Sequence, residues 1–252
     1  MLYSEDIQRE AEAHARSVFP NESVGFVVDG TYVPQKNVAT DLENNFTVPA
    51  QALLEQSGPV QGIIHSHPNG PNYPNKIDMQ GQIDTDVPWG ILPINKYESS
   101  GEYVAQPILW WGDSLPIRPL IGRGFIHGVS DCYALIRDYY RTELGITIPD
   151  FPRDWGWWTK GEKLYDMGFE QAGFVQVSMG DPKPGDVFLA AIRCKTPNHG
   201  GIWLGGPTSE ILHHLTSRNA VDITWLSRRE PGVRYLNFVQ NGGKWLRHKE
   251  ML

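Results

Sequence analysis

A short stretch with two prolines, residues 112–119 (GDSLPIRP), most constrains the fold, because it separates two segments that have their own secondary-structure patterns. Proline fixes φ and donates no backbone hydrogen bond, and the stretch has little periodicity, so we predict a linker there. A chain of 252 residues is long enough for two domains that each bury a core. We therefore predict one domain over residues 1–111 and a second over residues 120–252.

The first segment combines a helical pattern with strand-like runs. After Ser4, a good N-cap, apolar residues recur at helical spacing, which predicts a helix to about Val18 that Pro20 ends. Short apolar runs between polar residues predict strands. The predicted strands occupy residues 24–28, 46–48, 60–65, 89–94 and 104–110, and a short helix is predicted over residues 50–56.

The second segment begins with helices and continues with strands. Asp131 and Gly145 are good capping residues for a helix over residues 132–144, and another helix is predicted over residues 159–171. Five strand-like runs then predict an antiparallel sheet. These runs are residues 187–192, 201–204, 211–215, 221–225 and 234–239. The predicted fold class is α+β, with a mixed α/β first domain and an antiparallel sheet in the second.

Charge and composition argue against several classes of function. The net charge is −7 and Lys and Arg form no block, which disfavours a nucleic-acid partner or an anionic membrane surface. The first residues carry acids where a signal peptide needs bases, and no run approaches the roughly 20 apolar residues of a membrane span. We expect a protein that folds in a reducing cytosol, with Cys132 and Cys194 as free thiols.

The sequence HSHP at residues 65–68 follows an apolar strand and predicts a metal site. Side chains two residues apart on an extended chain point the same way, so both imidazoles can face one ion. The proline turns the chain into a loop that leads to Asp78, whose carboxylate is a third ligand. Such a donor set leaves one position of a tetrahedral Zn²⁺ for water, as in catalytic sites. Glu22 is a candidate base for that water.

This segment resembles the JAMM, or MPN+, metalloproteases. Their signature is a distant Glu, then His-x-His-Pro, then Ser-x-x-Asp, with ten residues between the second His and the Asp. The resemblance covers about residues 1–110. It implies that the zinc ligands are His65, His67 and Asp78 and that Glu22 is the general base.

The chain departs from the JAMM signature at Asn75, which occupies the position of the family's Ser. That Ser helps to hold the oxyanion in the family. An Asn amide also donates a hydrogen bond, but it is longer and differently placed. We expect zinc binding to survive this change and the activity of the metal module to be the property at risk.

Cys132 predicts a second site. It follows a capping Asp and so lies in the first turn of its helix, where the helix dipole and free N–H groups lower a thiol pKa. Downstream, His199 opens the run HGGIWLG, and a turn then leads to a histidine pair, so a hairpin brings His199 near that pair. His213 and His214 face opposite sides of a strand, so only one can orient His199.

These elements resemble the NlpC-type cysteine peptidases, papain-like enzymes of bacterial cell-wall turnover and of phage tails. The match covers about residues 120–240, with Gly-x-x-Asp-Cys, His-x-Gly-Ile-aromatic-apolar-Gly and a later His after two apolar residues. It implies Cys132 as nucleophile, His199 as general base and acid, and His213 as the residue that orients His199. Many members carry a Tyr about a dozen residues before the Cys, and this chain has none there. The Cys132 N–H then carries more of the oxyanion role, with His127 as a possible helper.

A JAMM-like module followed by an NlpC-type module, without a signal peptide, is similar to a family of tail-tip proteins of lambda-like siphophages. The resemblance implies a component of the virion tail tip, assembled in the host cytoplasm, whose partners are other tail-tip and hub proteins. It also implies peptidase action on peptidoglycan stem peptides during DNA entry, a part in tail-tip assembly, and Zn²⁺ as cofactor. The alternative is a structural tail-tip protein in which zinc is only a staple.

Overall fold

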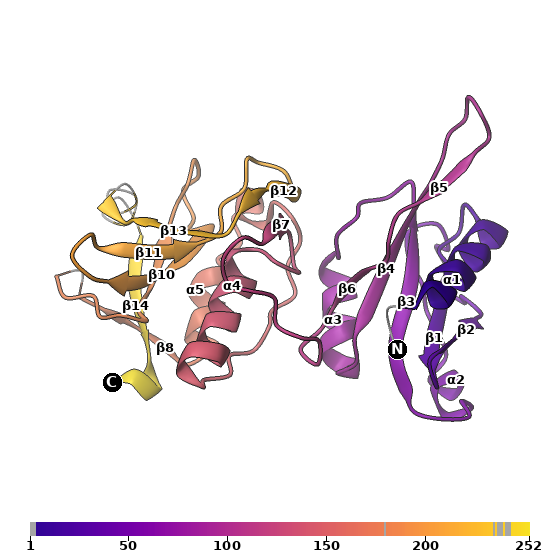
Figure 1. Ribbon diagram of the computed structural model, residues 1–252, viewed down its shortest axis with the longest axis horizontal. Coiled ribbons are helices and arrows are strands. Elements are labelled where there is room, and N and C mark those ends of the chain that lie inside the picture. Colours follow the sequence, from indigo (N-terminus) through magenta and orange to yellow (C-terminus); the bar gives the residue numbers. More distant parts are fainter. Residues whose placement is uncertain (1–3, 179, 234, 236–238, 240–242) are drawn as a thin grey trace. The chain divides into compact units, whose positions relative to one another are not determined.

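The computed structural model describes residues 4–178, 180–233, 235, 239 and 243–252 (Figure 1). The chain forms two compact units, Met1–Pro74 with Gly81–Pro116 and Ile117–Leu252 with Asn75–Gln80. Both units combine helices with sheets, which confirms the predicted α+β class.

The first unit is built on a six-stranded sheet with the order β2-β1-β3-β4-β5, in which β6 also pairs with β4. The strands are β1 (Val24–Val28), β2 (Thr31–Gln35), β3 (Val60–Pro68), β4 (Trp89–Lys96), β5 (Tyr103–Ala105) and β6 (Leu109–Trp111). The helices α1 (Glu5–Val18) and α2 (Ala50–Leu54) belong to this unit, and so does the second half of α3 (Lys76–Thr85), from Gly81 on. The pair β3–β4 is parallel and the other pairs are antiparallel.

Helix α1 covers the core of this unit. The Ser4 hydroxyl accepts a hydrogen bond from the backbone N–H of Ile7 at 3.2 Å, as expected of an N-cap. Ile7, Ala11 and Ala15 recur at helical spacing and are buried. They pack against sheet residues that include Val27, Ile64 and Leu92.

The second unit contains a six-stranded antiparallel sheet with the order β13-β11-β10-β9-β14-β8, and a separate pair of strands, β7 and β12. The sheet strands are β8 (Phe174–Val177), β9 (Val187–Ala190), β10 (His199–Gly205), β11 (Glu210–His213), β13 (Arg228–Pro231) and β14 (Lys244–His248). The separate pair is β7 (Gly124–Ile126) and β12 (Val221–Leu226). An antiparallel sheet was predicted, but the run predicted over residues 221–225 is β12, which pairs with β7 and does not belong to the six-stranded sheet.

Two α-helices, α4 (Cys132–Tyr139) and α5 (Leu164–Gln171), belong to the core of the described part of this unit. Helix α4 continues as a π-helical turn over Tyr140–Leu144 and ends at Gly145, whose φ of 68° suits glycine. Cys132 is itself a member of the core cluster, so this thiol lies at the edge of the unit's apolar interior.

Two predicted elements of the first unit differ from the structure. Residues 46–48 form no strand, because the Thr47 backbone pairs instead with the loop at Asn37 and Val38. The strand predicted over residues 104–110 is two strands, β5 and β6, which pair with β4 in succession. Pro107 lies between them and donates no hydrogen bond, so it interrupts the ladder.

In the second unit, the helix predicted over residues 159–171 starts only at Leu164. A short 3₁₀ turn, Trp157–Lys160, precedes it and ends at Gly161, whose φ of 78° breaks the helical path. The strand predicted over residues 234–239 falls mostly outside the described residues.

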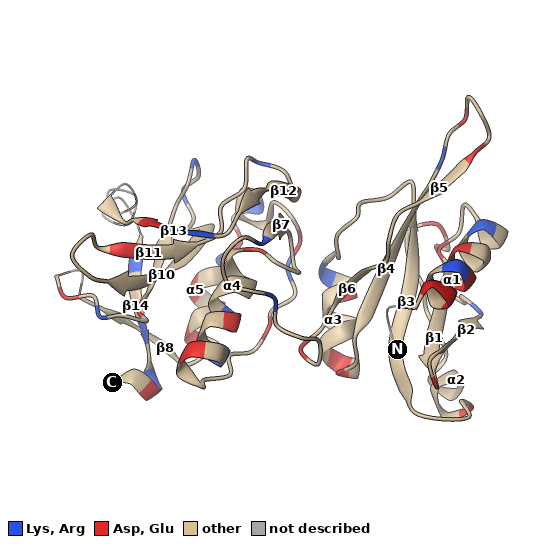
Figure 2. Cartoon of the chain, viewed as in Figure 1, with Lys and Arg blue, Asp and Glu red and all other residues tan. Residues whose placement is uncertain are grey.

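Charged side chains of both signs are interspersed over the helices and loops (Figure 2). On α1, for example, Arg9 pairs with Asp6 at 2.7 Å. No helix among the described residues has the length and apolar character needed to cross a membrane.

Candidate functional site

The predicted metal ligands lie together. One ligand atom from each of His65, His67 and Asp78 falls within 4.8 Å of the others, and all three residues are buried. The two Nε2 atoms are 3.0 Å apart. Two nitrogens bound tetrahedrally to one ion at about 2.0–2.1 Å would be roughly 3.4 Å apart, so the pair needs only a small adjustment to share a metal.

The strand–turn–helix geometry places these ligands. β3 extends from Val60 to Pro68, and the two histidines occupy one face of it because they are two residues apart. The Nδ1 of His67 donates to the Pro71 carbonyl at 2.6 Å, which leaves its Nε2 lone pair for a metal. The donor set therefore fits a divalent metal ion, because the hydrogen bond of His67 Nδ1 puts the lone pair of that ring on Nε2, next to His65.

Aromatic side chains enclose the metal cluster. The His65 ring contacts the rings of Phe46, Trp89 and Trp111, with centroids 4.8, 5.7 and 6.3 Å away. Such a shell keeps water out and strengthens electrostatic interactions at the ligands.

Glu22 lies on the same side of the sheet as the ligands. In the β1–β3 pair Val24 is opposite His65, and the pairing continues through Ser23, whose carbonyl accepts from the Ser66 N–H at 3.0 Å. Continuing this antiparallel register places Glu22 opposite His67. The residue is buried, with 8% of its surface exposed.

Asn75 has a local role that the sequence did not reveal. Its Oδ1 accepts from the backbone N–H groups of Ile77 at 2.6 Å and of Asp78 at 3.0 Å. In return Asp78 Oδ2 accepts from the Asn75 N–H at 2.9 Å. This reciprocal cap starts α3 and orients the Asp78 carboxylate, so Asn75 serves the metal cluster as a helix cap.

The nucleophile candidate lies at the capped start of α4. The Asp131 carboxylate accepts from the backbone N–H groups of Ala134 and Gly128, each at 2.9 Å. Arg153 donates two hydrogen bonds to the same carboxylate, from Nε to Oδ2 at 3.0 Å and from Nη2 to Oδ2 at 2.8 Å. These contacts fix the first turn of the helix and with it Cys132.

Two partners reach the Cys132 sulfur from later parts of the chain. The Tyr165 hydroxyl lies 3.0 Å from Sγ, and the backbone N–H of Gly200 also hydrogen-bonds to Sγ. Gly200 is the residue after His199 in β10, so this bond brings the thiol to the histidine strand. Sequence reasoning missed Tyr165, because it looked for a hydroxyl upstream of the cysteine.

The pKa of the Cys132 thiol differs from the prediction. Burial and the Asp131 charge raise the pKa of Cys132 to about 11, although the bonds from Tyr165 and Gly200 act in the opposite direction. The prediction of a lowered thiol pKa considered only the helix N-terminus and omitted desolvation, which is larger here. In the free protein Cys132 is therefore a thiol, and its attack on a carbonyl requires a base.

The histidines form a short chain of contacts. His199 Nε2 lies 3.1 Å from His213 Nδ1, while His214 Nε2 turns away to the Trp225 carbonyl at 2.9 Å. Burial is the largest cause that lowers the pKa of His213, to about 4, and it lowers the pKa of His199 well below its ordinary value. Both imidazoles are consequently neutral at pH 7.

His127 has other partners than the thiol. Its Nε2 is 3.0 Å from the Arg153 carbonyl and its Nδ1 is 3.7 Å from Asp131 Oδ2. The ring thus belongs to the ionic group that holds the helix start. These contacts do not support the predicted role of His127 as a helper of the oxyanion site.

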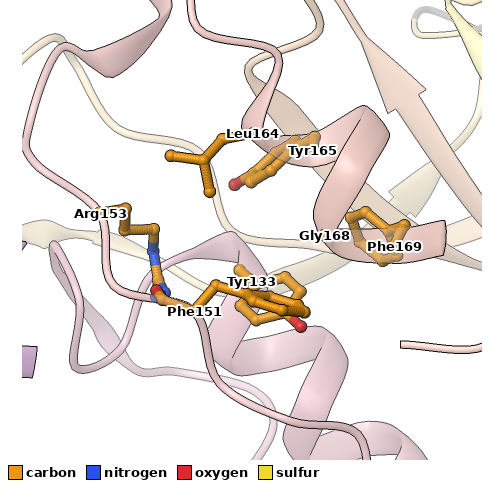
Figure 3. A pocket seen from close by; sticks show the side chains of 7 residues that line it. All are labelled: Tyr133, Phe151, Arg153, Leu164, Tyr165, Gly168 and Phe169. Atoms are coloured by element: carbon orange, nitrogen blue, oxygen red, sulfur yellow. The ribbon is translucent and has the colours of Figure 1, made fainter. Parts of the chain in front are cut away.

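A small apolar hollow lies beside the thiol's tyrosine partner (Figure 3). Figure 3 shows Tyr165 and Leu164 of α5 facing Arg153 and Tyr133 across it. The hollow has essentially no space for a water molecule. Cys132 is 6% exposed and His199 3%, so a substrate has to displace neighbouring side chains to reach them.

Comparison with known proteins agrees with this two-part organisation. Residues 111–240 match the model of the NlpC/P60 family, and residues 4–99 match that of prokaryotic homologs of the JAB domain. A solution structure from Desulfitobacterium hafniense, 20% identical, covers 46% of this chain and 92% of that one at a TM-score of 0.30, too low to carry an argument.

Two relatives extend over most of the chain. Tail tip assembly protein K of Escherichia phage lambda is 33% identical over 201 residues, which are 79% of this chain and 83% of the relative. Tail tip assembly protein K of Escherichia phage N15 is 28% identical over 235 residues, or 88% and 91% of the two chains. With a JAB-like domain followed by an NlpC/P60 domain, the chain belongs to the family of tail tip assembly protein K.

Proposed function

We propose that this chain is a component of the phage tail tip that hydrolyses amide bonds of peptidoglycan stem peptides with its cysteine module and takes part in tail-tip assembly. The location and the assembly role are supported by relatives that are named tail tip assembly proteins and match along most of their length. The peptidase activity is supported by the NlpC/P60 match. One observation carries the proposal: the strand that bears His199, paired with His213, also touches the Cys132 sulfur through Gly200.

The proposed reaction starts from a neutral thiol and a neutral imidazole. His199 takes the proton of Cys132 while Sγ attacks the amide carbon, and a C–S bond forms. The C–N bond then breaks, and the imidazolium gives its proton to the leaving amine. Water, deprotonated by His199, attacks the thioester and releases the carboxylic acid and the free thiol.

The oxyanion that forms during attack needs donors. The Cys132 backbone N–H lies in the first turn of α4, where N–H groups have no intrahelical acceptor. The Tyr165 hydroxyl, 3.0 Å from Sγ, is the second candidate. Burial raises the pKa of Tyr165 well above its ordinary value, so the phenol stays protonated and able to donate.

In the metal module, His65, His67 and Asp78 would hold Zn²⁺, and Glu22 would take a proton as general base. Bound zinc lowers the pKa of a coordinated water and polarises a carbonyl. Glu22, placed opposite His67 and largely shielded from solvent, is the group of this chain that can accept that proton. This module would cleave a second amide bond of the stem peptide, or an amide bond of a tail protein during assembly.

Digestion of purified sacculi tests the peptidase proposal. Purified full-length chain should release stem-peptide fragments that mass spectrometry identifies, and Cys132→Ala should abolish the release. The matched control is Cys194→Ala, because Cys194 is the other cysteine and its thiol bonds only locally, to the Thr196 carbonyl at 2.9 Å. Equal release by wild type and Cys132→Ala would rule out the cysteine mechanism.

A structural tail-tip role is the second candidate. It is favoured by the nearly buried thiol with its raised pKa and by Asn75, which acts as a helix cap where the JAMM signature has Ser. Phage carrying Cys132→Ala or Glu22→Gln discriminate between the two. Normal tails with normal infectivity would favour the structural role, whereas normal tails with impaired infectivity would favour catalysis.

A further inference from the structure

A carboxylate from the edge of the sheet completes the chain of contacts behind His199. Glu230 lies in β13, where it pairs with Ile211 of β11, so it is the diagonal neighbour of His213. Its Oε1 is 2.8 Å from Nε2 of His213, whose side chain is fully buried. The oxygen lies off the line of the ring N–H, and neither atom has a hydrogen-bond partner of standard geometry among the described residues.

Neighbouring groups keep this carboxylate ionised. Arg228 Nε donates to Glu230 Oε2 at 3.1 Å, and the Tyr235 hydroxyl also hydrogen-bonds to the carboxylate. Burial opposes ionisation, but these bonds lower the pKa of Glu230 below its ordinary value. The other charged or titratable groups that act on the histidines are His214 and Arg228, both of which disfavour an imidazolium.

An ionised carboxylate determines where the histidine protons reside. It can only accept, so His213 must carry its proton on Nε2, and the Nδ1 of that neutral ring must be an acceptor. His199 Nε2, 3.1 Å away, must then be a donor. Its remaining nitrogen, Nδ1, is left with the lone pair that a base needs.

We propose that Glu230 is a positioning residue that fixes the tautomers of His213 and His199, so that Nδ1 of His199 is the basic nitrogen presented to Cys132. This inference rests on the proposed cysteine peptidase function and adds a fourth member to its site. It also gives a reason for the pairing of two histidines. His213 on β11 lies between Glu230 on β13 and His199 on β10, and it transmits the tautomer preference of the carboxylate to His199.

The variant Glu230→Gln tests the proposal because it retains the shape and can donate through its amide. Donation to His213 Nε2 forces the proton onto Nδ1 of that ring and reverses His199 as well. In a serine triad the same exchange of an orienting carboxylate for an amide lowers turnover about 10⁴-fold. The control is Glu210→Gln, the same change at a half-buried position of β11.

Long-range ¹H–¹⁵N spectra of labelled full-length protein at pH 7 report imidazole tautomers directly, with assignment by single His→Gln variants. We expect Nε2–H on both rings in wild type and in Glu210→Gln, and Nδ1–H in Glu230→Gln. A wild-type His199 that carries its proton on Nδ1 overturns the proposal, and this reading holds even if Glu230→Gln does not fold. Unchanged tautomers in a folded Glu230→Gln protein overturn it too.

Alkylation by iodoacetamide in a Cys194→Ala background gives a second reading without a peptide substrate. Glu230→Gln should slow the reaction of Cys132 at pH 7 about tenfold, because the reversed tautomer can no longer accept the thiol proton, and Glu210→Gln should not. These measurements separate the two hypotheses. Expected tautomers without cleavage of sacculi would refute the peptidase function alone, whereas cleavage that needs Cys132 but survives Glu230→Gln would refute the role of Glu230 alone.

Discussion

Replacing Arg153 by Met should destabilise the second unit more than any surface change. The Arg153 side chain is 2% exposed, and it contacts Asp131 through two nitrogens and Asp150 through a third. Removing one partner of a buried ion pair costs about 3–5 kcal/mol, because the other charge stays buried without compensation. We expect a loss of this size in the free energy of unfolding at pH 7.

The pKa of Asp131 gives an independent magnitude and the sign of the pH dependence. Burial raises this pKa, but Arg153, His127 and two backbone N–H donors together lower it to about 2 from an ordinary 3.8. That difference corresponds to roughly 2 kcal/mol of stability at neutral pH, which wild type loses as pH falls through about 2. This contribution is smaller than the loss of stability expected for Arg153→Met, because the variant also retains an uncompensated buried charge.

The pKa shift of Asp131 has the opposite sign in the variant. Without Arg153 the burial of Asp131 dominates, so its pKa lies above the ordinary value and protonation on acidification relieves the buried charge. The stability difference between wild type and Arg153→Met should therefore shrink as pH falls from 7 to 3. Arg118→Met, at an exposed position, is the control and should change stability by less than about 0.5 kcal/mol.

Labelling of Cys132 by a thiol reagent across a urea series measures the unfolding of its own unit. A Cys194→Ala background makes Cys132 the sole thiol, and its burial makes labelling of the folded unit slow compared with labelling of the unfolded unit. A loss below 1 kcal/mol at pH 7, or a difference that does not change with pH, would refute the assigned role of the Arg153–Asp131 pair.

Three further substitutions have defined outcomes. Tyr165→Phe removes a hydrogen bond to Cys132 Sγ, so the thiol pKa should rise further and alkylation at neutral pH should slow about tenfold; an unchanged rate–pH profile would contradict the contact. Gly201→Ala places a Cβ 2.6 Å from the Phe188 ring, so unfolding by urea should show a loss of about 1–3 kcal/mol, and full stability would contradict this packing. His67→Ala removes one of three ligands, so metal analysis should find the bound Zn²⁺ greatly reduced, and retention of a full equivalent would exclude the cluster as the zinc site.

The features that sequence predicted well are those with a local physical cause. Ser4 and Asp131 cap helices where expected, because a capping side chain bonds only two or three residues ahead. The ligands on β3 share a face through the period of two along a strand. Three predictions differ from the structure in the described residues: the strand at 46–48, the single strand over 104–110 and the helix start that Gly161 delays. In each, a tertiary, proline or turn constraint overrode local propensity. The sequence patterns also did not predict β2, α3, β7, β8, β13 and β14.

The contacts that sequence missed are set by tertiary structure. Tyr165 follows Cys132 by 33 residues and reaches it only because α5 packs in the same core as α4. Glu230 reaches His213 through the register of an edge strand, and a shift of one residue would turn its side chain to the other face. Neither the spacing of residues in a motif nor a capping rule predicts the register of an edge strand.

The two sites therefore differ in how folding assembles them. Two metal ligands come from one strand and the third from the next helix, within 14 residues of sequence from His65 to Asp78, so β3, the turn and α3 bring them together locally. The cysteine site needs α4, β10, β11 and β13 in register before Cys132, the His199–His213 pair and Glu230 all take their places. Partial unfolding of the sheet edge at β13 would leave the thiol and His199 in place and remove only the group that orients the base. The reactivity of Cys132 should accordingly depend on the integrity of β13, whereas metal binding by His65, His67 and Asp78 should not.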